Sequence, residues 1–529
     1  MTDAKKNIIA LLLAFSVLTS LPWLVPGTGF LALVSFVPLL YAERMASDAG
    51  VRRFFFWYFA AFILWNAFTT FWVCNATVGG GIFAVVANAL QMSAVFALFR
   101  AGRRRLPGVL PYIFLAACWV AWERWYLSAE ISWPWLLLGN AFARTTSAVQ
   151  WYCVTGTLGG SLWIWAVNLS LFGLGVSLGD GRFRKWNGKA RFAAVFATAL
   201  ISAGPVLLSE AMYVSYREVS ESEVDALVGQ PNFDPYEKFE SIPRAGQDAI
   251  LIGQFRSGAS GKAPDIFVAP ETFTSGVNLA DIGSGVTYSA FRSFLDTLPN
   301  STILFGASTY DIFNTASRPS ILARPFMNGW YEGHNSAIAI DASGRTEVFH
   351  KSRLVVGTEK IPYPRVFVPL DERLGYVMGR CVGQDEISVL HLSDGTPFGC
   401  AVCYESVYGE YCTGYVKKGA GFLSVITNDA WWGDTPGYRQ HLSYSALRAI
   451  ELRRDIVRCG NTGISAFINQ RGDIVSRTSW WERQTLRGTV NTNSKRTFFV
   501  RYGDIAGRVC TLAFLLLLAL ALVGVRRSE

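Results

Sequence analysis

The sequence predicts a multi-pass α-helical membrane domain joined to an α/β domain built as an α-β-β-α sandwich. Of its 529 residues, 51% are hydrophobic, which is too apolar for an ordinary soluble enzyme. Long apolar runs occupy both ends of the chain, whereas strands and helices alternate between them. We therefore expect a transmembrane bundle of about seven spans at 1–209, a globular domain at 210–505 and a final transmembrane helix at 506–529.

Eight apolar segments account for the membrane part. Several approach the roughly 20 residues that an α-helix needs to cross a bilayer. The first two are short and are separated by Pro22, Pro26 and Gly27, so they form either two spans or one re-entrant hairpin. The eight segments are 8–21, 28–42, 54–73, 82–99, 109–128, 157–178, 191–208 and 509–525.

The basic residues indicate how these segments are oriented. They gather in alternate connections, whereas the connections near 22–27 and 74–81 contain no lysine or arginine. By the positive-inside rule both termini are cytoplasmic, and seven crossings place residues 210–508 on the other side of the membrane. The residues that mark the cytoplasmic side are Lys5, Lys6, Arg44, Arg52, Arg53, Arg100, Arg103, Arg104, Arg105, Arg182, Arg184, Lys185, Lys189, Arg526 and Arg527.

The formal net charge of +9 raises the question of nucleic-acid binding. The basic residues, however, lie largely in short connections between apolar runs, where they report membrane orientation. We therefore expect no nucleic-acid partner.

Tryptophans mark the outer face of the predicted bundle. Trp133 and Trp135 lie in the connection 129–156, which the predicted orientation places outside the cytoplasm. Tryptophans at this depth usually anchor a protein at the headgroup level of the bilayer. The alternative is that they line a lipid entry to a site in the outer domain.

Residues 210–505 predict two sheets with helices outside, because strands alternate with helices and hairpins. Helices are expected from Tyr236 to Phe255, near 286–297, from Glu405 to Val416 and over His441–Arg453. The expected strands are Glu223–Val228, Asp265–Ala269, Thr302–Ser308, His334–Ile340, Thr346–Arg353, Phe398–Val402, Phe422–Thr427, Asp455–Cys459, Ile464–Asn469 and Asp473–Arg477.

Cys403 stands at the corner between the strand Phe398–Val402 and the helix that follows. At such a corner a tight turn exposes the sulfur, and the first amides of the helix lower a thiol pKa. These are properties of a nucleophile, although an arbitrary cysteine is more often a small buried apolar residue. Cys400 completes a CxxC pair, but residues three apart on a strand face opposite sides. We therefore expect Cys400 to pack in the core, and we expect no metal site.

Polar residues with complementary chemistry follow other apolar strands. Glu271 and the pair Asn428-Asp429 each come just after a strand, and Lys351 lies on the second strand of a hairpin. In α/β sheets, sites form at this edge. Each residue alone has a structural explanation, since strand-end carboxylates often cap helices and lysines are usually solvated. Together with Cys403 they supply a nucleophile, a base and a cation.

These residues resemble the nitrilase (carbon-nitrogen hydrolase) superfamily, whose site is a Glu, a Lys and a Cys in that chain order at strand ends. Here they are Glu271 in VAPETF, Lys351 in FHKSRLV and Cys403 in GCAVCYES. A nitrilase-like domain between several spans and one last span is similar to the apolipoprotein N-acyltransferase family, over nearly the whole chain. Further matching blocks are the SWPW loop at 132–135, TNDAWWGD at 427–434 and RAIELRRDIVRCGNTGI at 448–464.

The resemblance implies two half-reactions through a thioester on a Glu-Lys-Cys triad. Glu271 would act as the general base and Cys403 as the nucleophile. Lys351 and the backbone amide of Tyr404 would hold the oxyanion. No metal, nucleotide or other cofactor is implied.

The resemblance also implies supporting roles. Glu359, which keeps a spacing of eight from Lys351, and Glu405 would orient that lysine or relay protons. Trp431 and Trp432 would form a mobile lid or a lipid contact, or else pack in the core.

The implied reaction moves a fatty acyl chain from a membrane phospholipid to the α-amino group of a diacylglyceryl-cysteine, at the N-terminus of an apolipoprotein. It implies a bacterial inner-membrane protein with its catalytic domain on the periplasmic, extracytoplasmic side, and we expect a monomer. The alternative is a membrane-anchored amidase or nitrilase-type hydrolase, which would keep the same triad but discharge the thioester to water.

Two other classes fit the sequence less well. A transporter should carry paired charges in its spans, where Glu123 and Arg124 are nearly the only candidates. A Cys-His hydrolase would have to use His441, which follows a Gly/Pro-rich loop.

Overall fold

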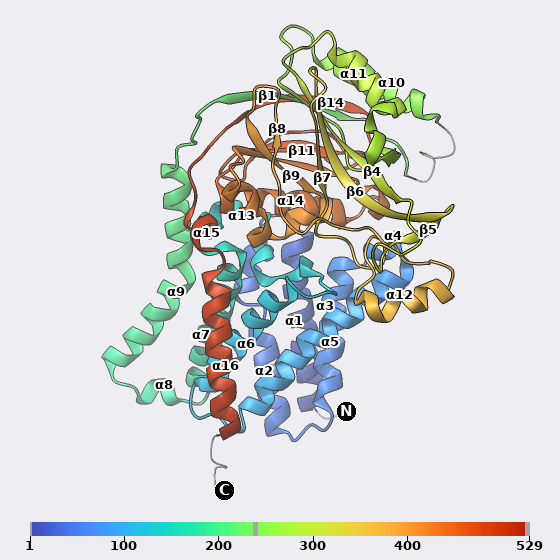
Figure 1. Ribbon diagram of the computed structural model, residues 1–529. Coiled ribbons are helices and arrows are strands. Elements are labelled where there is room, and N and C mark those ends of the chain that lie inside the picture. The colour runs from blue at the N-terminus through green and yellow to red at the C-terminus, as the bar shows by residue number, and fades with distance from the viewer. Residues whose placement is uncertain (1–2, 236–237, 239–241, 524–529) are drawn as a thin grey trace. The chain divides into compact units, whose positions relative to one another are not determined.

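The computed structural model describes residues 3–235, 238 and 242–523. Its contacts divide the chain into two compact units (Figure 1). The membrane unit comprises residues 1–129, 133–216 and 502–529, and the α/β unit comprises residues 130–132 and 217–501. Residues 236, 237 and 239–241 of the helix predicted from Tyr236 to Phe255, and the predicted cytoplasmic markers Arg526 and Arg527, lie outside the described residues.

The membrane unit is helical because a chain inside a bilayer must satisfy its own backbone hydrogen bonds. Within the described part of the chain, six stretches are long and apolar enough to cross a membrane. The protein is therefore a multi-pass membrane protein. The six stretches are Asp3–Leu24, Gly29–Asp48, Val78–Gly102, Tyr152–Gly179, Gly188–Ser215 and Ile505–Val523.

Each of the eight predicted apolar segments overlaps a helix in its described residues. Two of these helices, α3 (Phe54–Thr70) and α6 (Leu110–Tyr126), have 17 residues each and are short for a span. The count of eight spans therefore stays a prediction. The other helices of this unit are α1 (Asp3–Leu24), η1 (Gly29–Leu33), α2 (Val37–Asp48), α4 (Val73–Ala76), α5 (Val78–Gly102), η2 (Pro134–Leu136), η3 (Leu138–Phe142), η4 (Thr146–Val149), α7 (Tyr152–Gly179), α8 (Arg182–Lys185), α9 (Gly188–Ser215) and α16 (Ile505–Val523).

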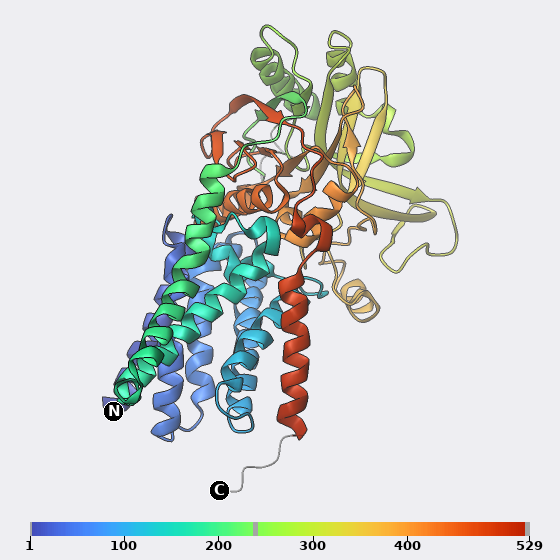
Figure 2. The same ribbon diagram turned by 90° about the vertical axis from the view of Figure 1, so that its left-hand side faces the viewer.

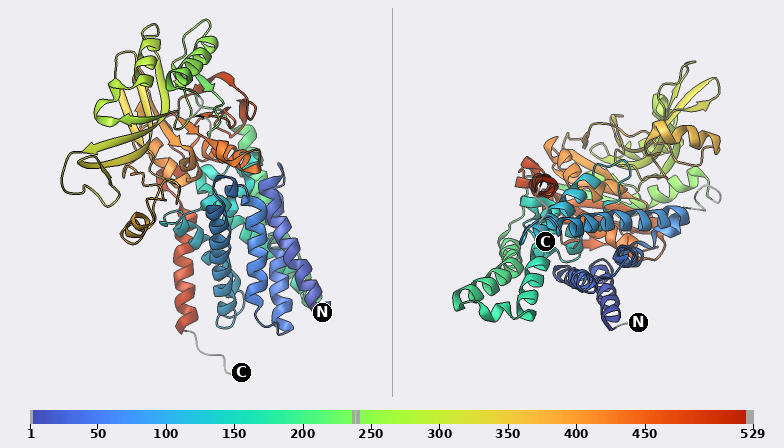
Figure 3. Two further views of the ribbon diagram at one scale, coloured as in Figure 1. Left: turned by 90° about the vertical axis from the view of Figure 1, so that its right-hand side faces the viewer. Right: turned by 90° about the horizontal axis from the view of Figure 1, so that it is seen from below.

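Aromatic packing holds the bundle together. The ring of Phe36 lies 4.5 Å from that of Trp165 and 5.4 Å from that of Trp119, between centroids. Buried Glu43 on α2 pairs with Arg100 and Arg103 near the end of α5. The long helices run side by side in Figures 2 and 3, where the red helix α16 packs against α6.

Two sheets form the core of the α/β unit. The first has the strand order β14-β1-β2-β4-β6-β5, with β3 beside β4 and β7 beside β6. The second has the order β13-β12-β11-β10-β9-β8. Strands β9, β10 and β11 are parallel neighbours, as are β1, β2 and β4, so the carboxyl ends within each group share an edge.

Ten strands agree with the predicted ones in order and, within a few residues, in extent, although β4 and β6 are longer; strands β3, β5, β8 and β14 were not predicted. The strands are β1 (Glu223–Gln230), β2 (Ile266–Val268), β3 (Thr274–Asn278), β4 (Thr302–Phe313), β5 (Arg324–Phe326), β6 (Gly329–Asp341), β7 (Thr346–His350), β8 (Leu390–His391), β9 (Pro397–Val402), β10 (Phe422–Thr427), β11 (Ile456–Gly460), β12 (Ala466–Ile468), β13 (Ile474–Arg477) and β14 (Gln484–Asn491).

Helices cover the outer face of each sheet, as Figure 1 shows. Helices α10 (Arg244–Gly258) and α11 (Val286–Leu295) pack on the first sheet, where Phe255 and Phe294 join the core around Phe267. Helices α13 (Gly409–Lys417) and α14 (Pro436–Leu452) pack on the second. Contacts between β1 and β11 and between β6 and β9 join the sheets face to face. The predicted α-β-β-α sandwich is confirmed.

Three predicted helices differ from the observed ones, and one of them, α14, begins at Pro436, before the predicted start at His441. Helix α10 begins at Arg244, directly after Pro243, whose fixed φ suits the residue before a helix. The helix predicted from Glu405 to Val416 is divided into a 3₁₀ turn, η6 (Cys403–Val407), and α13, because Tyr408 between them is extended. The remaining short helices are η5 (Leu279–Ser284), α12 (Pro364–Arg373), η7 (Asp429–Trp432) and α15 (Phe498–Tyr502).

Candidate active site

The three residues predicted to carry the chemistry follow the ends of three strands. Glu271 comes three residues after β2, whereas Lys351 and Cys403 come directly after β7 and β9. Cys403 and Thr272 have backbone φ angles of +53° and +46°. These angles lie in the left-handed region, which residues other than glycine rarely adopt. Such strain persists where the surrounding structure imposes it, and it clusters at functional sites.

Glu271 and Lys351 belong to a buried charge cluster. Lys351 Nζ lies 3.0 Å from Glu271 Oε1 and 2.9 Å from Glu359 Oε1. Asn335 Nδ2 donates to the same two oxygens, at 2.8 and 2.7 Å. The N–H of Asn428 donates to Glu271 Oε2 at 3.1 Å. Although burial alone lowers it, Glu271 and Glu359 hold the pKa of Lys351 well above its usual range.

Cys403 is 9% exposed and lies close enough to this cluster to respond to its charges. Burial and Glu271 raise the pKa of its thiol well above the usual range, and Lys351 opposes them. The predicted lowering of this pKa by helix amides is therefore wrong. The α-helix begins only at Gly409, so burial and the Glu271 carboxylate outweigh the short 3₁₀ turn at the cysteine. Such a thiol reacts only when a base takes its proton.

A buried His-Asp-Arg network holds the backbone of the cysteine turn. His441 Nε2 contacts the carbonyl oxygen of Cys403 at 3.1 Å, and His441 Nδ1 contacts Asp429 Oδ1 at 2.8 Å. Arg458 donates to Asp429 Oδ2 at 2.7 Å. Although burial raises it, His441 and Arg458 lower the pKa of Asp429 to about 2. The position of Asp429 just after a strand could be predicted from the sequence. The contact of His441 with Cys403 could not, because it depends on how α14 packs.

Cys403, Asp429 and His441 each offer a ligand atom, and these atoms lie within 4.8 Å of one another. The chemistry of this set does not suit a metal ion. Arg458, a cation that never gives up its proton, already occupies one oxygen of Asp429, and His441 contacts the other. A second cation beside Arg458 would be repelled in a buried site.

Glu405 ties three segments together around the site. Its Oε1 accepts from the N–H of Ser352 at 2.7 Å and from Tyr411 Oη at 2.8 Å, and its Oε2 accepts from the N–H of Val402 at 2.8 Å. Burial raises the pKa of Glu405, and these hydrogen bonds oppose the rise. Glu405 therefore fixes the backbone next to Lys351, while Glu359 contacts the lysine side chain itself.

The remaining predicted residues lie in different surroundings. Tyr404 follows the cysteine in η6. Trp431 is 38% exposed, whereas the ring of Trp432 lies 5.5 Å from that of His441. In the membrane unit the rings of Trp133 and Trp135 stack at 5.2 Å, and each also packs near Trp72. Their predicted roles toward lipid stay predictions.

Sequence reasoning missed Lys238, which is 4% exposed. Its Nζ donates to the carbonyl oxygen of Thr272, next to Glu271 in the chain. Burial and Arg244 lower the pKa of Lys238 to about 7, and Glu271 opposes them. No sequence signal sets this lysine apart, because its burial follows from the fold of the segment after β1. A lysine that titrates near neutral pH therefore contacts the backbone next to Glu271.

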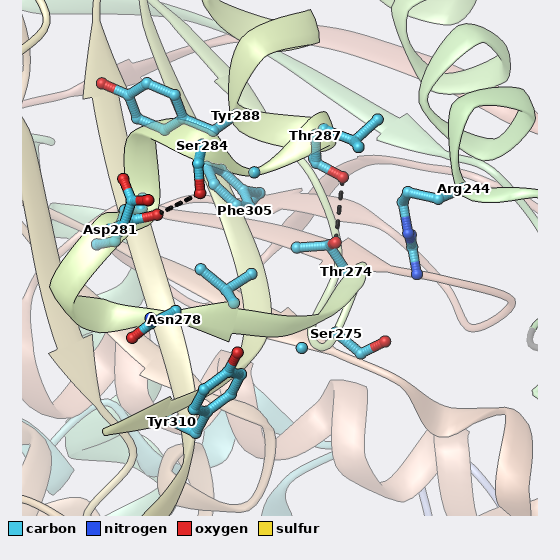
Figure 4. Close-up of a pocket in the computed structure, with 15 residues that line it drawn as sticks. Arg244, Thr274, Ser275, Asn278, Asp281, Ser284, Thr287, Tyr288, Phe305 and Tyr310 are labelled. Carbon is cyan, nitrogen blue, oxygen red and sulfur yellow. Dashed lines mark hydrogen bonds between the residues drawn. The ribbon is translucent and has the colours of Figure 1, made fainter. Parts of the chain in front are cut away.

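A cavity of about 400 Å³ lies on the first sheet, between β3, η5 and α11 (Figure 4). Arg244, Thr274 and Tyr310 are among its lining residues, and Thr274 and Thr287 share a hydrogen bond of 3.1 Å. Its lining does not include Glu271, Lys351 or Cys403.

His350 should make the protein less stable in mild acid. Its Nδ1 contacts Ser336 Oγ at 2.7 Å, and its ring stacks on that of His334 at 4.3 Å. Burial and His334 lower the pKa of His350 to about 4, and Asp311 opposes them. Because an unfolded histidine titrates near 6.5, the unfolded state binds the proton first as the pH falls from about 6.5 to about 4.

We expect this residue to remove about 2 kcal/mol from the free energy of unfolding over that range, allowing for its partial exposure. Denaturant unfolding of the full-length protein in detergent, at pH 7 and pH 4, measures the loss. His350→Asn should reduce the pH dependence by that amount. The same pH dependence in both proteins would contradict the argument.

Two family models match the chain. Residues 230–497 match the carbon-nitrogen hydrolase family, and residues 15–170 match the apolipoprotein N-acyltransferase N-terminal domain. The chain is 28% identical to the apolipoprotein N-acyltransferase of Chlorobaculum tepidum, covering 91% of this chain and 89% of that protein. It is 26% identical to that of Geobacter metallireducens, covering 96% and 93%. Saccharomyces cerevisiae Nit3, from branch 10 of the nitrilase superfamily, has a TM-score of 0.36 at 11% identity, covering 52% and 93%.

Proposed function

The chain belongs to the carbon-nitrogen hydrolase family, and we propose that it is an enzyme of apolipoprotein N-acylation. It transfers a fatty acyl chain from a membrane phospholipid, through a thioester on Cys403, to the α-amino group of an N-terminal diacylglyceryl-cysteine. The observation that carries this proposal is the buried cluster of Glu271, Lys351 and Cys403 in a chain that also has several membrane helices.

In the first half-reaction Glu271 takes the proton of the Cys403 thiol, and the thiolate attacks the ester carbonyl of the phospholipid. The ammonium of Lys351 and the N–H of Tyr404 stabilise the oxyanion that forms. The ester C–O bond breaks, the departing lysophospholipid oxygen takes the proton back from Glu271, and the acyl group stays on sulfur. The high pKa of the thiol supports a mechanism in which deprotonation is coupled to the attack.

In the second half-reaction the acceptor amine attacks the thioester carbonyl, and Glu271 takes a proton from the nitrogen. The C–S bond breaks, an amide forms, and the sulfur of Cys403 recovers a proton from Glu271. Glu359 shares Lys351 with Glu271 and so keeps the ammonium in place through both steps. Glu405 holds the backbone beside the lysine.

We propose domain limits of 1–209 and 506–529 for the membrane part and 210–505 for the catalytic part. The catalytic part acts on the periplasmic side of a bacterial inner membrane, as a monomer. Because α9 precedes it and α16 follows it in the chain, it is tethered to the bilayer at both ends. Both substrates, the phospholipid and the lipid-modified acceptor, are anchored in the same bilayer. Tethering the catalytic part to that bilayer therefore raises their effective concentration at the site. Trp133, Trp135, Trp431 and Trp432 are candidate lipid contacts.

The test is a transfer assay with full-length protein in mixed micelles. A phospholipid with a labelled acyl chain is supplied together with a synthetic lipopeptide that begins with diacylglyceryl-cysteine. We expect the label in an amide at the lipopeptide N-terminus. An N-acetylated lipopeptide, which has no free amine, should take up no label. Release of the label only as free fatty acid would favour the hydrolase alternative.

A further inference from the structure

Asn335 lies on β6 at the centre of the charge cluster. It is 5% exposed, and its Nδ2 donates to Glu271 Oε1 at 2.8 Å and to Glu359 Oε1 at 2.7 Å. Its backbone carbonyl oxygen also accepts from the N–H of Lys351 at 2.8 Å. One asparagine therefore contacts both carboxylates through its side chain and positions the lysine through its backbone.

The charges around Asn335 do not balance. Two carboxylates face the single ammonium of Lys351, which contacts the same two oxygens. In a buried site two like charges that share one cation repel each other, and a proton on one of them relieves the repulsion. The two N–H bonds of one amide group reduce that repulsion without adding a charge, because each N–H dipole points its positive end at a carboxylate oxygen.

The amide orientation is fixed by its neighbours. If Asn335 were flipped, its Oδ1 would face two carboxylate oxygens, which have no proton to donate. In the observed orientation Oδ1 is buried and has no hydrogen-bond partner among the described residues. Buried polar atoms are seldom left unpaired, because the hydrogen bond that each loses to water is then not replaced by one within the protein. The unpaired Oδ1 is unfavourable, but the same orientation lets both amide N–H groups donate to the glutamates.

We propose that Asn335 is a positioning residue that holds the carboxyl groups of Glu271 and Glu359 in place around Lys351, so that Glu271 is free to take the proton of Cys403. The assignment of that proton transfer to acyl transfer rests on the proposed function. Asn335 acts through Glu271 and is assigned no contact with a substrate. The ionisable groups that face the two glutamates are Lys351, Lys238, Cys381, Cys400 and Cys403.

The test uses alkylation of Cys403, which requires no lipid substrate. Full-length protein in detergent is treated with iodoacetamide over a pH series, and the rate at Cys403 is read by mass spectrometry of its peptide. Wild type is compared with Asn335→Asp and Asn335→Ser. Asn493→Asp is the matched control, because Asn493 is also buried but contacts the backbone of Arg453 and Lys495 instead of the glutamates.

We expect Asn335→Asp to move the alkylation midpoint upward by at least about one pH unit, because a third carboxylate disfavours the thiolate. At pH 7 the rate should fall about tenfold or more. Asn335→Ser, which keeps one donor at most, adds no charge and should shift the midpoint the other way, downward, because a glutamate that takes a proton no longer raises the pKa of the thiol. Asn493→Asp should leave it in place. In acyl transfer, the Asn335 variants should lower kcat while KM for the phospholipid stays unchanged.

A midpoint unchanged in Asn335→Asp, with thermal unfolding like that of wild type, would overturn the inference. If Asn335→Asp does not fold, Asn335→Ser decides by the same criterion. The two proposals fail separately. A shifted midpoint without acyl transfer in wild type overturns the proposed function alone, whereas normal transfer with unchanged midpoints overturns the role of Asn335 alone.

Discussion

Cys403→Ala should abolish acyl transfer, lowering kcat by about 10⁴-fold or more, because the acyl group then has no atom to occupy between donor and acceptor. The fold should survive, since the change removes one sulfur atom from a side chain that is 9% exposed. The measurement is the rate of N-acyl lipopeptide formation, with the thermal unfolding midpoint recorded alongside it.

Cys400→Ala is the matched control for this prediction. Cys400 is the other cysteine of the CxxC pair, is 1% exposed, and lies within β9 as the sequence predicted. Its variant should keep most of the activity and lose some stability to a small cavity. Cys403→Ser keeps the shape of the site and should react far more slowly, since a hydroxyl is a weaker nucleophile. Substantial activity in Cys403→Ala would exclude a thioester on this residue.

Lys351→Met should damage both catalysis and stability. Loss of one oxyanion donor typically lowers kcat by about 10²–10³-fold. The same change leaves Glu271 and Glu359 buried together without their cation, and breaking a buried ion pair in this way costs about 3–5 kcal/mol of unfolding free energy. Transfer kinetics and denaturant unfolding of the full-length protein measure the two effects.

Lys360→Met separates this effect from the general cost of losing a lysine. Lys360 Nζ lies 2.7 Å from Glu130 Oε2, but its side chain is 33% exposed. Exposed ion pairs contribute little, so this variant should lose less than about 1 kcal/mol and keep its activity. Equal losses in the two lysine variants would show that the buried cluster has no special role.

The chemistry-bearing strand ends could be predicted because they leave local signals. Glu271 and Cys403 each follow a short apolar run, so each could be placed just after the carboxyl end of a strand, where sites form. Lys351 could be placed on a hairpin by its turn residues. The apolar segments of the membrane unit could be predicted equally well, since length and composition are enough to predict a helix in a bilayer.

The contacts that complete the site could not be predicted, because they join residues that are distant in the chain. Asn335 lies 64 residues from Glu271, and only the packing of β6 beside β4 and β7 brings its amide to the glutamates. His441 reaches the Cys403 carbonyl through the packing of α14. The thiol pKa was predicted with the wrong sign because burial, which dominates it, has no local sequence signal.

The thioester on Cys403 can be detected directly from the mass of the Cys403 peptide after incubation with a phospholipid of one acyl composition. We expect that peptide to gain the mass of one acyl chain, which hydroxylamine should remove. Addition of the diacylglyceryl lipopeptide should remove the acyl chain from the peptide and deliver it to the lipopeptide amine. A peptide that never gains the acyl mass, or an adduct that yields only free fatty acid in the presence of acceptor, would contradict the account.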